Sequence, residues 1–131
     1  MSLVFDTEAL LAFYLGEPAG GEVEKRLERT MKGEILGYIN IINLAEVYYI
    51  LHRRSPELAA EKERNLRGFG VKIVPIEDNR IWRQAAMTKS KHALSLADAF
   101  AVATAEIKNA KLLTCRDAEF EGIDVDIDRI R

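Results

Sequence analysis

Short apolar runs alternate with longer amphipathic segments along the whole chain. Each run is short enough to be a buried strand, and each of the following segments has apolar residues at helical spacing. The expected strands lie at 3–5, 34–39, 71–74 and 111–114, with a short fifth candidate at 125–127. The expected helices lie at 7–15, 22–32, 43–54, 57–67 and 95–105, and one more runs from a cap at Asp78 to Lys89. This order predicts an α/β sandwich with a mostly parallel sheet of four to five strands.

The composition limits the classes of protein to which this chain can belong. A chain of 131 residues with 48% hydrophobic and 31% charged residues is typical of one globular domain, which we expect to span 1–131. A net charge of -2 and a pI near 5.8 give no overall electrostatic attraction for nucleic acid. Any binding of nucleic acid must therefore use local basic patches or a bound metal ion.

Cysteine usage and hydropathy bear on the compartment. Cys115 is the only cysteine, so the chain has no intrachain disulfide and suits a reducing environment. The apolar start at Leu3–Phe5 is too short for a signal peptide, and the apolar stretch 38–51 is interrupted by polar residues. These observations predict a cytoplasmic protein without membrane association.

The segment from Ser95 to Ala105 is apolar or small on all sides, yet it carries one carboxylate, Asp98. A helix without a polar face is buried. Burying an ionised carboxylate is costly unless a cation or several hydrogen bonds meet it. Ser95 and Asp98 have the spacing of a capping box, which gives Asp98 a purely structural alternative. The remaining carboxylates decide between the two interpretations.

Three further acids are expected at the carboxyl edge of the sheet, where ligand sites of parallel sheets form. Asp6 directly follows the first strand, Glu46 lies in the first turn of the helix that starts at Asn43, and Asp117 follows the strand at 111–114. Each also has a capping interpretation: Asp6 and Asp117 at helix starts, and Asn43 with Glu46 as a capping box. Together with Asp98 they form a candidate site of four acids.

Such a cluster favours a divalent cation. Two carboxylates about 5 Å apart repel by roughly 3 kcal/mol at an effective dielectric constant near 20, so the cluster must hold protons or a cation. Oxygen ligands without histidine or cysteine indicate Mg²⁺ or Mn²⁺ rather than zinc, and the sequence lacks the calcium-binding loop of an EF-hand. A Mg²⁺ ion held by carboxylates typically serves phosphoryl chemistry, which predicts a phosphodiesterase or a phosphatase.

The same residues resemble the ordered motifs of PIN-domain ribonucleases, specifically the VapC-type toxins. The resemblance covers essentially the whole chain. The motifs are Leu3–Thr7, Asn43–Val47, Ser95–Ala99, Leu112–Thr114 and Asp117–Phe120. The resemblance implies a compact α/β/α domain, Mg²⁺-dependent (or Mn²⁺-dependent) endonucleolytic cleavage of single-stranded RNA, homodimerisation, and inhibition by a VapB-type antitoxin.

The resemblance also assigns the metal-binding acids. Asp6, Glu46 and Asp98 match the family pattern directly, whereas the fourth position departs from it. The family usually has one residue between the threonine and the acid, but Cys115 and Arg116 both stand between Thr114 and Asp117. We assign Asp117 as the fourth acid, with Glu119 as the alternative.

Other polar residues near the expected site have two interpretations each. The hydroxyls of Thr7 and Thr114 can position a water or a phosphate, or they can satisfy backbone groups. Basic side chains can bind RNA phosphates, or they can form a solvated surface. These basic residues are Lys89, Lys91, His92 and Arg116.

Five alternative functions were weighed on the sequence. His52 and His92 can be assigned as base and acid of a metal-free ribonuclease, although His52 lies about 120° around its helix from Glu46. Receiver domains and haloacid-dehalogenase phosphatases also place acids after strands, but Asp6-Thr7-Glu8 fits neither pattern well. A PIN domain can also process ribosomal or other RNA, or act as a non-catalytic binding module.

Overall fold

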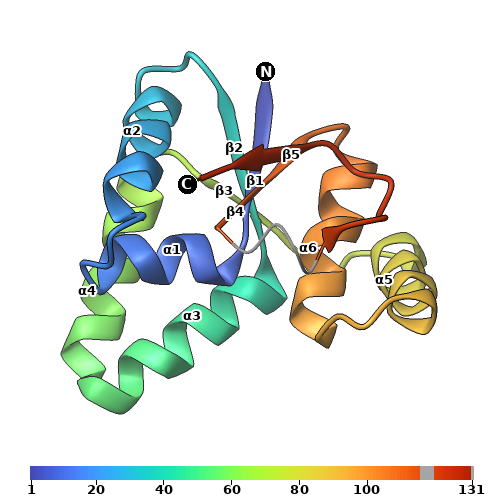
Figure 1. The fold of residues 1–131 in the computed structure, drawn as a ribbon. Helices are drawn as coiled ribbons and strands as arrows, with labels where there is room; N and C mark the ends of the chain where they lie inside the picture. The colour runs from blue at the N-terminus through green and yellow to red at the C-terminus, as the bar shows by residue number, and fades with distance from the viewer. Residues whose placement is uncertain (116–119, 131) are drawn as a thin grey trace.

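Parallel strands form the centre of the molecule (Figure 1). The computed structural model describes residues 1–115 and 120–130. Within this part of the chain the sheet contains β1 (Ser2–Phe5), β2 (Leu36–Asn40), β3 (Lys72–Val74), β4 (Lys111–Thr114) and β5 (Ile127–Arg129). The spatial order is β3-β2-β1-β4-β5, and every neighbouring pair is parallel. The predicted parallel sheet is confirmed, and its five described strands all run in one direction.

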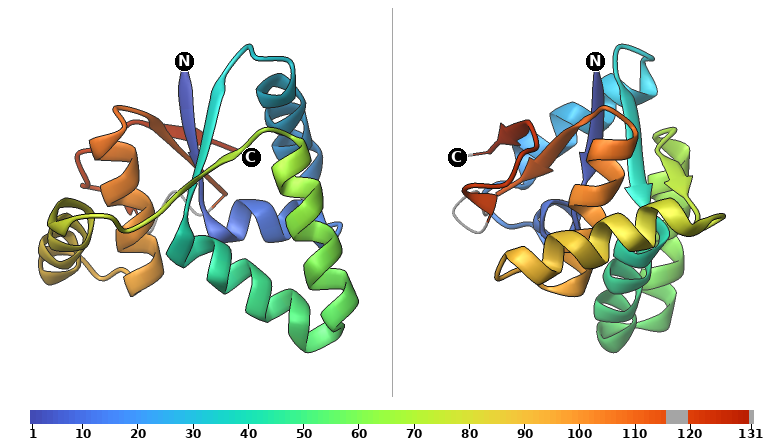
Figure 2. Two further views of the ribbon diagram at one scale, coloured as in Figure 1. Left: turned by 180° about the vertical axis from the view of Figure 1, so that it is seen from behind. Right: turned by 90° about the vertical axis from the view of Figure 1, so that its right-hand side faces the viewer.

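Helices cover both faces of this sheet, as the two views of Figure 2 show. One face carries α1 (Thr7–Tyr14), α2 (Gly20–Met31), α3 (Ile41–Arg54) and α4 (Pro56–Gly68). The other face carries α5 (Asn79–Lys91) and α6 (Leu96–Ile107). The result is the expected α/β/α sandwich. No helix within the described ranges combines the length and the apolar character needed to cross a membrane.

Alternation along the central strand divides the core between the two helical layers. Leu3 and Phe5 pack with the layer of α1 to α4, whereas Val4 packs with α6 residues such as Val102. Successive side chains of a strand point to opposite faces, so the three apolar residues of β1 serve both layers. Leu3, Val4 and Phe5 are each completely buried. Both helical layers therefore pack on the same strand, β1.

Several boundaries and faces differ from the sequence expectation. Helix α2 begins at Gly20 rather than at residue 22, and β5 lies at 127–129 rather than 125–127. Met31 and Trp82 are apolar residues of helices, but they are 56% and 43% exposed. In the last turn of α2 the buried residue is Thr30 rather than Met31.

The start of α3 is also corrected. This helix begins at Ile41, and Asn40 is its N-cap, because the Asn40 side chain accepts a hydrogen bond from the Ile42 amide at 2.8 Å. The predicted capping box of Asn43 and Glu46 is therefore wrong. Asn43 lies inside the helix and Glu46 lies beyond its first turn.

An ion pair holds the last strand against the helical layer. Arg26 of α2 donates to both carboxylate oxygens of Asp128 in β5, at 2.8 and 3.0 Å. Both side chains are mostly shielded from solvent, with 17% and 19% exposure. Two-pronged pairs of this kind have fixed geometry and are stronger than ordinary surface pairs. The pair connects two segments that lie far apart in the sequence.

We predict that Asp128→Asn lowers the free energy of unfolding at pH 7 by about 1 kcal/mol, because it removes the charge from a shielded ion pair. Hydrogen bonds from Arg26 hold the pKa of Asp128 below its ordinary value of 3.8. A carboxyl with a lowered pKa stabilises the folded state above its unfolded pKa and loses this effect as the pH falls through its folded pKa. The difference between variant and wild type should therefore vanish at acid pH.

Urea denaturation at several pH values measures this difference. Asp126→Asn is the matched control, because Asp126 is exposed and has no ion pair within the described chain. Equal effects of the two substitutions would contradict the prediction.

Candidate active site

The carboxyl ends of the strands meet at one edge of the sheet, and Asp6 lies directly at this edge. The register aligns Phe5 of β1 with Leu113 of β4, and the Asp6 amide donates to the Leu113 carbonyl at 3.4 Å. On the other side, Val4 aligns with Tyr38 of β2. Asp6 thus stands at the middle strand of the edge, where the chain leaves β1 and enters α1.

The Asp6 carboxylate is completely buried. Its Oδ1 accepts a hydrogen bond from the Ala9 amide at 2.7 Å, so Asp6 is the N-cap of α1. The expected capping role is confirmed. The partial positive charge at the start of a helix offsets part of the cost of burying a carboxylate there. This cap also fixes the side chain in one orientation at the sheet edge.

Asp98 lies at the start of a helix in the other helical layer, as Asp6 does in the first. It lies in the first turn of α6 and is only 4% exposed. The Ser95 hydroxyl accepts a hydrogen bond from the Asp98 amide at 3.1 Å, which confirms Ser95 as the N-cap. Every residue from Asp98 to Ala105 is buried, as the apolar sequence predicted. The capping role belongs to Ser95, and the Asp98 carboxylate stays at the buried start of the helix.

Glu46 lies on α3, which starts directly after β2. It is half-buried, and within the described chain its side chain makes no hydrogen bond or ion pair. The late position of Glu46 in the helix follows from the corrected helix start at Ile41. Glu46 is thus more exposed than Asp6 and Asp98.

One side chain joins the three segments that carry these acids. The Asn43 Nδ2 donates to the Thr7 hydroxyl at 3.2 Å and to the Ala97 carbonyl at 3.0 Å. Thr7 is the neighbour of Asp6 in the sequence, and Ala97 is the neighbour of Asp98. Asn43 itself precedes Glu46 by one helical turn. The structure therefore brings the starts of α1, α3 and α6 to the same place.

The sequence interpretation missed Asn43 as a component of the site. Asparagine before an apolar helical run is typical of an N-cap, and this pattern was misleading. Asn43 is instead completely buried. A buried amide on the inner face of a helix needs partners for its hydrogen-bonding groups, which is the signal that identifies it.

The side chains at this edge offer the type of metal ligand that a hard divalent cation prefers. Asp6, Glu46 and Asp98 provide only carboxylate oxygens, which Mg²⁺ and Mn²⁺ prefer. Within 1–115 and 120–130, however, no three side chains of His, Cys, Asp or Glu are grouped closely enough to hold a metal ion. Asp117, its alternative Glu119 and the basic Arg116 lie outside the described residues. The described acids therefore provide donors of a suitable type but do not by themselves form a metal site.

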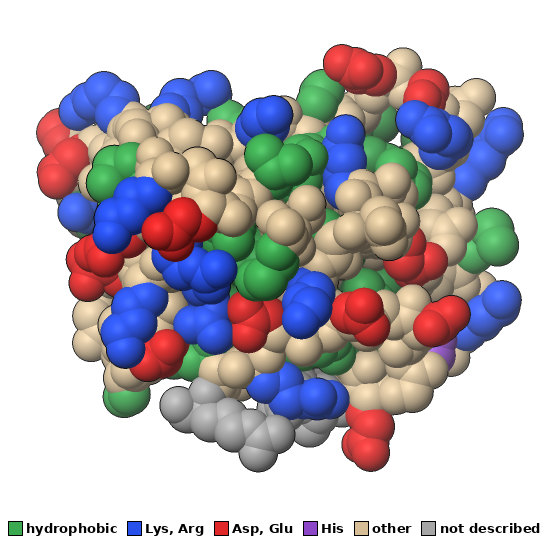
Figure 3. Space-filling view, turned by 90° about the horizontal axis from the view of Figure 1, so that it is seen from above, with side chains coloured by type: hydrophobic (Ala, Val, Ile, Leu, Met, Phe, Trp, Pro, Cys, Tyr) green, Lys and Arg blue, Asp and Glu red, His purple; other side chains and the backbone are tan. Residues whose placement is uncertain are grey.

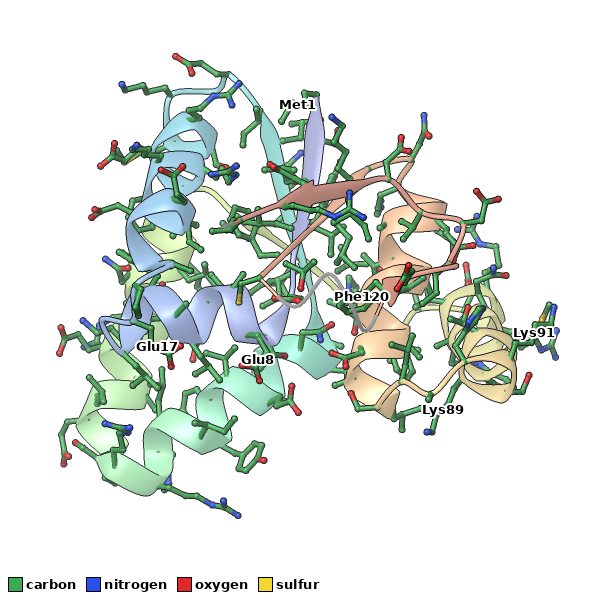
Figure 4. The ribbon with its side chains drawn as sticks, viewed as in Figure 1. Met1, Glu8, Glu17, Lys89, Lys91 and Phe120 are labelled. Atoms are coloured by element: carbon green, nitrogen blue, oxygen red, sulfur yellow. The ribbon has the colours of Figure 1, made fainter. Side chains whose placement is uncertain are left out.

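Threonine and lysine side chains near this edge have structural contacts. The Thr7 hydroxyl accepts from Asn43, and Thr114 at the end of β4 is completely buried. The Lys89 ammonium donates to the Leu94 carbonyl at 2.8 Å and so fastens the loop that leads into α6. Figure 4 places Lys89 and Lys91 at α5, and it places Glu8 at the end of the sheet opposite Met1. Lys91 remains exposed to solvent.

The two histidines occupy helix ends that lie on opposite sides of the molecule (Figure 1). His52 lies in the last turn of α3, where its ring stacks on Tyr48 with centroids 6.1 Å apart. His92 is the C-cap of α5. A base and an acid that act on one phosphate must both reach it, so this placement does not support a histidine pair.

The face over the amino ends of the strands has a mixed charge. Figure 3 shows lysine and arginine side chains interspersed with aspartate and glutamate on this face. Ion pairs such as Arg29 with Glu34 belong to this pattern. Nucleic acid binds to continuous positive surfaces, which this face does not present. The buried carboxylates at the opposite edge remain the candidate active site.

Comparisons with known proteins agree with this fold. The sequence profile of the PIN domain matches residues 3–126. No curated protein is significantly similar to the chain in sequence. Similar solved structures include a VapBC2 complex from Rickettsia felis bound to a DNA fragment from its promoter, with a TM-score of 0.81 and 17% identity over 100% of both chains.

Two further structures share the fold. DNA-bound VapBC from Salmonella typhimurium has a TM-score of 0.80 and 15% identity over 98% of both chains. VapC20 from Mycobacterium tuberculosis, a toxin that cleaves the sarcin-ricin loop, has a TM-score of 0.65 and 16% identity over 83% of this chain and 85% of that chain. At these identities the similarity establishes the fold.

We predict that Ser95→Ala lowers the free energy of unfolding by about 1 kcal/mol, because the first turn of α6 loses the acceptor for the Asp98 amide. Ser90→Ala is the matched control, since its exposed hydroxyl only donates to the Met87 carbonyl within α5. That control should change the free energy by less than about 0.5 kcal/mol. Urea denaturation of both variants measures the difference. A neutral Ser95→Ala would show that the cap does not hold the helix start.

Proposed function

We propose that this chain, which belongs to the PIN-domain family, is an endoribonuclease that depends on Mg²⁺ or Mn²⁺ and cleaves single-stranded RNA. The observation that carries the proposal is the pair of buried carboxylates, Asp6 and Asp98, on segments that Asn43 joins at the carboxyl edge of the sheet. Buried carboxylates without a catalytic or binding role are costly and rare. Their position agrees with the ligand site of parallel sheets.

Each acid has a defined task in this proposal. Asp6, Glu46, Asp98 and Asp117 would hold the ion, with Glu119 as the alternative fourth ligand. When bound, the ion lowers the pKa of a water molecule and offsets the negative charge that develops on the phosphate oxygens. Asp6 and Asp98 are held by helix starts on opposite layers, so their carboxylates need little rearrangement during the reaction. The half-buried Glu46 is the acid that can adapt its side chain.

The biological setting is proposed from the same family. Two of the similar structures are VapBC complexes bound to DNA, and a third protein is an RNA-cleaving toxin. We therefore assign this chain as the VapC-type toxin of a type II toxin-antitoxin pair, with a VapB-type antitoxin as its partner. In this proposal residues 1–131 form one PIN domain, which acts in the cytoplasm as a homodimer and not at a membrane.

We predict that Asp98→Asn reduces cleavage of a single-stranded RNA oligonucleotide by about 100-fold or more, because it removes a buried ligand charge at the reacting centre. Calorimetry with Mn²⁺ should show binding to the wild type and much weaker binding to Asp98→Asn. Asp124→Asn is the matched control, since Asp124 is an exposed aspartate in the loop before β5. This control should cleave and bind Mn²⁺ as the wild type does.

The outcomes separate the competing functions. A wild type that binds RNA without binding Mn²⁺ and without cleaving would indicate a non-catalytic module and would overturn the proposal. Normal cleavage by Asp98→Asn would overturn the assignment of the site. Cleavage confined to structured ribosomal fragments would favour RNA processing over the proposed single-stranded substrate.

We also expect a chelator to abolish cleavage and excess Mg²⁺ or Mn²⁺ to restore it, because in the proposed mechanism the ion supplies the lowered pKa of the attacking water and offsets the charge on the phosphate. His52→Ala and His92→Ala should retain activity in the presence of Mg²⁺. Rates measured on one RNA oligonucleotide with and without EDTA provide the readout. Full activity in EDTA, combined with loss in both histidine variants, would instead establish metal-free general acid-base catalysis.

A further inference from the structure

We infer that Asn43 is a positioning residue that sets the placement of the acid-bearing segments relative to one another. The inference rests on the proposed function, because its consequence is the geometry of the cation site. Asn43 was assigned from the sequence to helix capping, and Asn40 performs that role instead. A different explanation for a completely buried amide at residue 43 is therefore required.

The contacts of Asn43 connect all three segments. Its Nδ2 donates to Thr7, next to Asp6, and to the carbonyl of Ala97, next to Asp98. Glu46 follows three residues later on the same side of α3. One planar group thus fixes the distances between the starts of α1, α3 and α6. A small displacement of Asn43 changes the separation of the carboxylates on two helical layers at once.

The orientation of the amide follows from its partners. A backbone carbonyl only accepts hydrogen bonds, so the nitrogen of Asn43 must face Ala97. The Asn43 Oδ1 is then buried, and it has no hydrogen-bond partner in the described part of the protein. A buried acceptor without a donor carries the full penalty of its lost hydration.

Asn40 provides an internal comparison one turn earlier on the same chain segment. It is also completely buried, but both ends of its amide have partners. Its Oδ1 accepts from the Ile42 amide at 2.8 Å, and its Nδ2 donates to the Thr104 hydroxyl at 3.0 Å. Capping and packing fully account for Asn40. Capping and packing do not account for the Asn43 Oδ1, which has no hydrogen-bond donor within the described residues.

Two threonines give a matched pair of variants for the test. Thr7 and Thr104 are both almost completely buried, and each hydroxyl accepts from one of these asparagines. Thr7→Val removes an acceptor of Asn43 next to Asp6, whereas Thr104→Val removes the acceptor of Asn40, and neither Thr104 nor Asn40 is next to an acid of the site in the sequence. Asn43→Leu removes both hydrogen bonds of Asn43 and its Oδ1 while keeping a similar volume. The readouts are Mn²⁺ affinity by calorimetry, kcat and KM on an RNA oligonucleotide, and unfolding in urea.

We expect Asn43→Leu to weaken Mn²⁺ binding by roughly 10-fold or more, which is the usual effect of removing a group that orients metal ligands. Its kcat should fall while KM for the RNA stays near the wild-type value. Thr7→Val should show a smaller loss of Mn²⁺ affinity. Thr104→Val should lower stability without changing Mn²⁺ affinity, since its contacts, with Asn40 and with the Phe100 carbonyl, do not include the residues next to Asp6 and Asp98.

The outcomes are distinguishable. Mn²⁺ affinity that stays at the wild-type value in both Asn43→Leu and Thr7→Val would overturn the inference and leave the proposed function intact. An equal loss in Thr7→Val and Thr104→Val would also overturn it, because the effect would then follow stability alone. If Asn43→Leu does not fold, the threonine pair decides. Absence of Mn²⁺ binding to the wild type would overturn the proposed function together with the inference.

Discussion

A buried amide that gives its hydrogens to two different segments is the interaction on which this site depends. The donors of Asn43 serve α1 through Thr7 and α6 through Ala97, across both faces of the sheet. Inside a protein such hydrogen bonds are strong, and leaving their partners unsatisfied is expensive. The three helix starts are therefore fixed as a unit. The parallel sheet brings these starts to one edge, and the amide sets their spacing there.

Helix starts also explain how the protein tolerates two carboxylates in its interior. Asp6 accepts the Ala9 amide as the N-cap of α1, and Asp98 lies in the first turn of α6. The first backbone amides of a helix have no partner within the helix. Together with the aligned peptide dipoles, they favour negative charge at these positions. The capping and the metal-binding interpretations are thus compatible, because the feature that makes a carboxylate a good cap also offsets the cost of its burial.

Local signals in the sequence were sufficient for the architecture. The apolar run before Asp6 and the uniformly apolar segment after Ser95 predicted a buried strand and a buried helix, and both are confirmed. The start of α3 was misplaced because apolar residues stand on both sides of Asn40 across the end of β2, at Ile39, Ile41 and Ile42. Hydrophobicity alone does not show where such a segment changes from strand to helix. The contact of Asn43 with Ala97, 54 residues away, depends on tertiary packing and has no local signal.

The edges of the sheet constrain how copies of this chain associate. Strands β3 and β5 form the two edges, and each is only three residues long. Lys72 is exposed on one edge and Arg129 on the other. Short edges with charged side chains disfavour the addition of a further strand, which protects against aggregation. Continuation of the sheet from one copy into the next is therefore disfavoured, and a dimer of this chain would have to form through the helical layers.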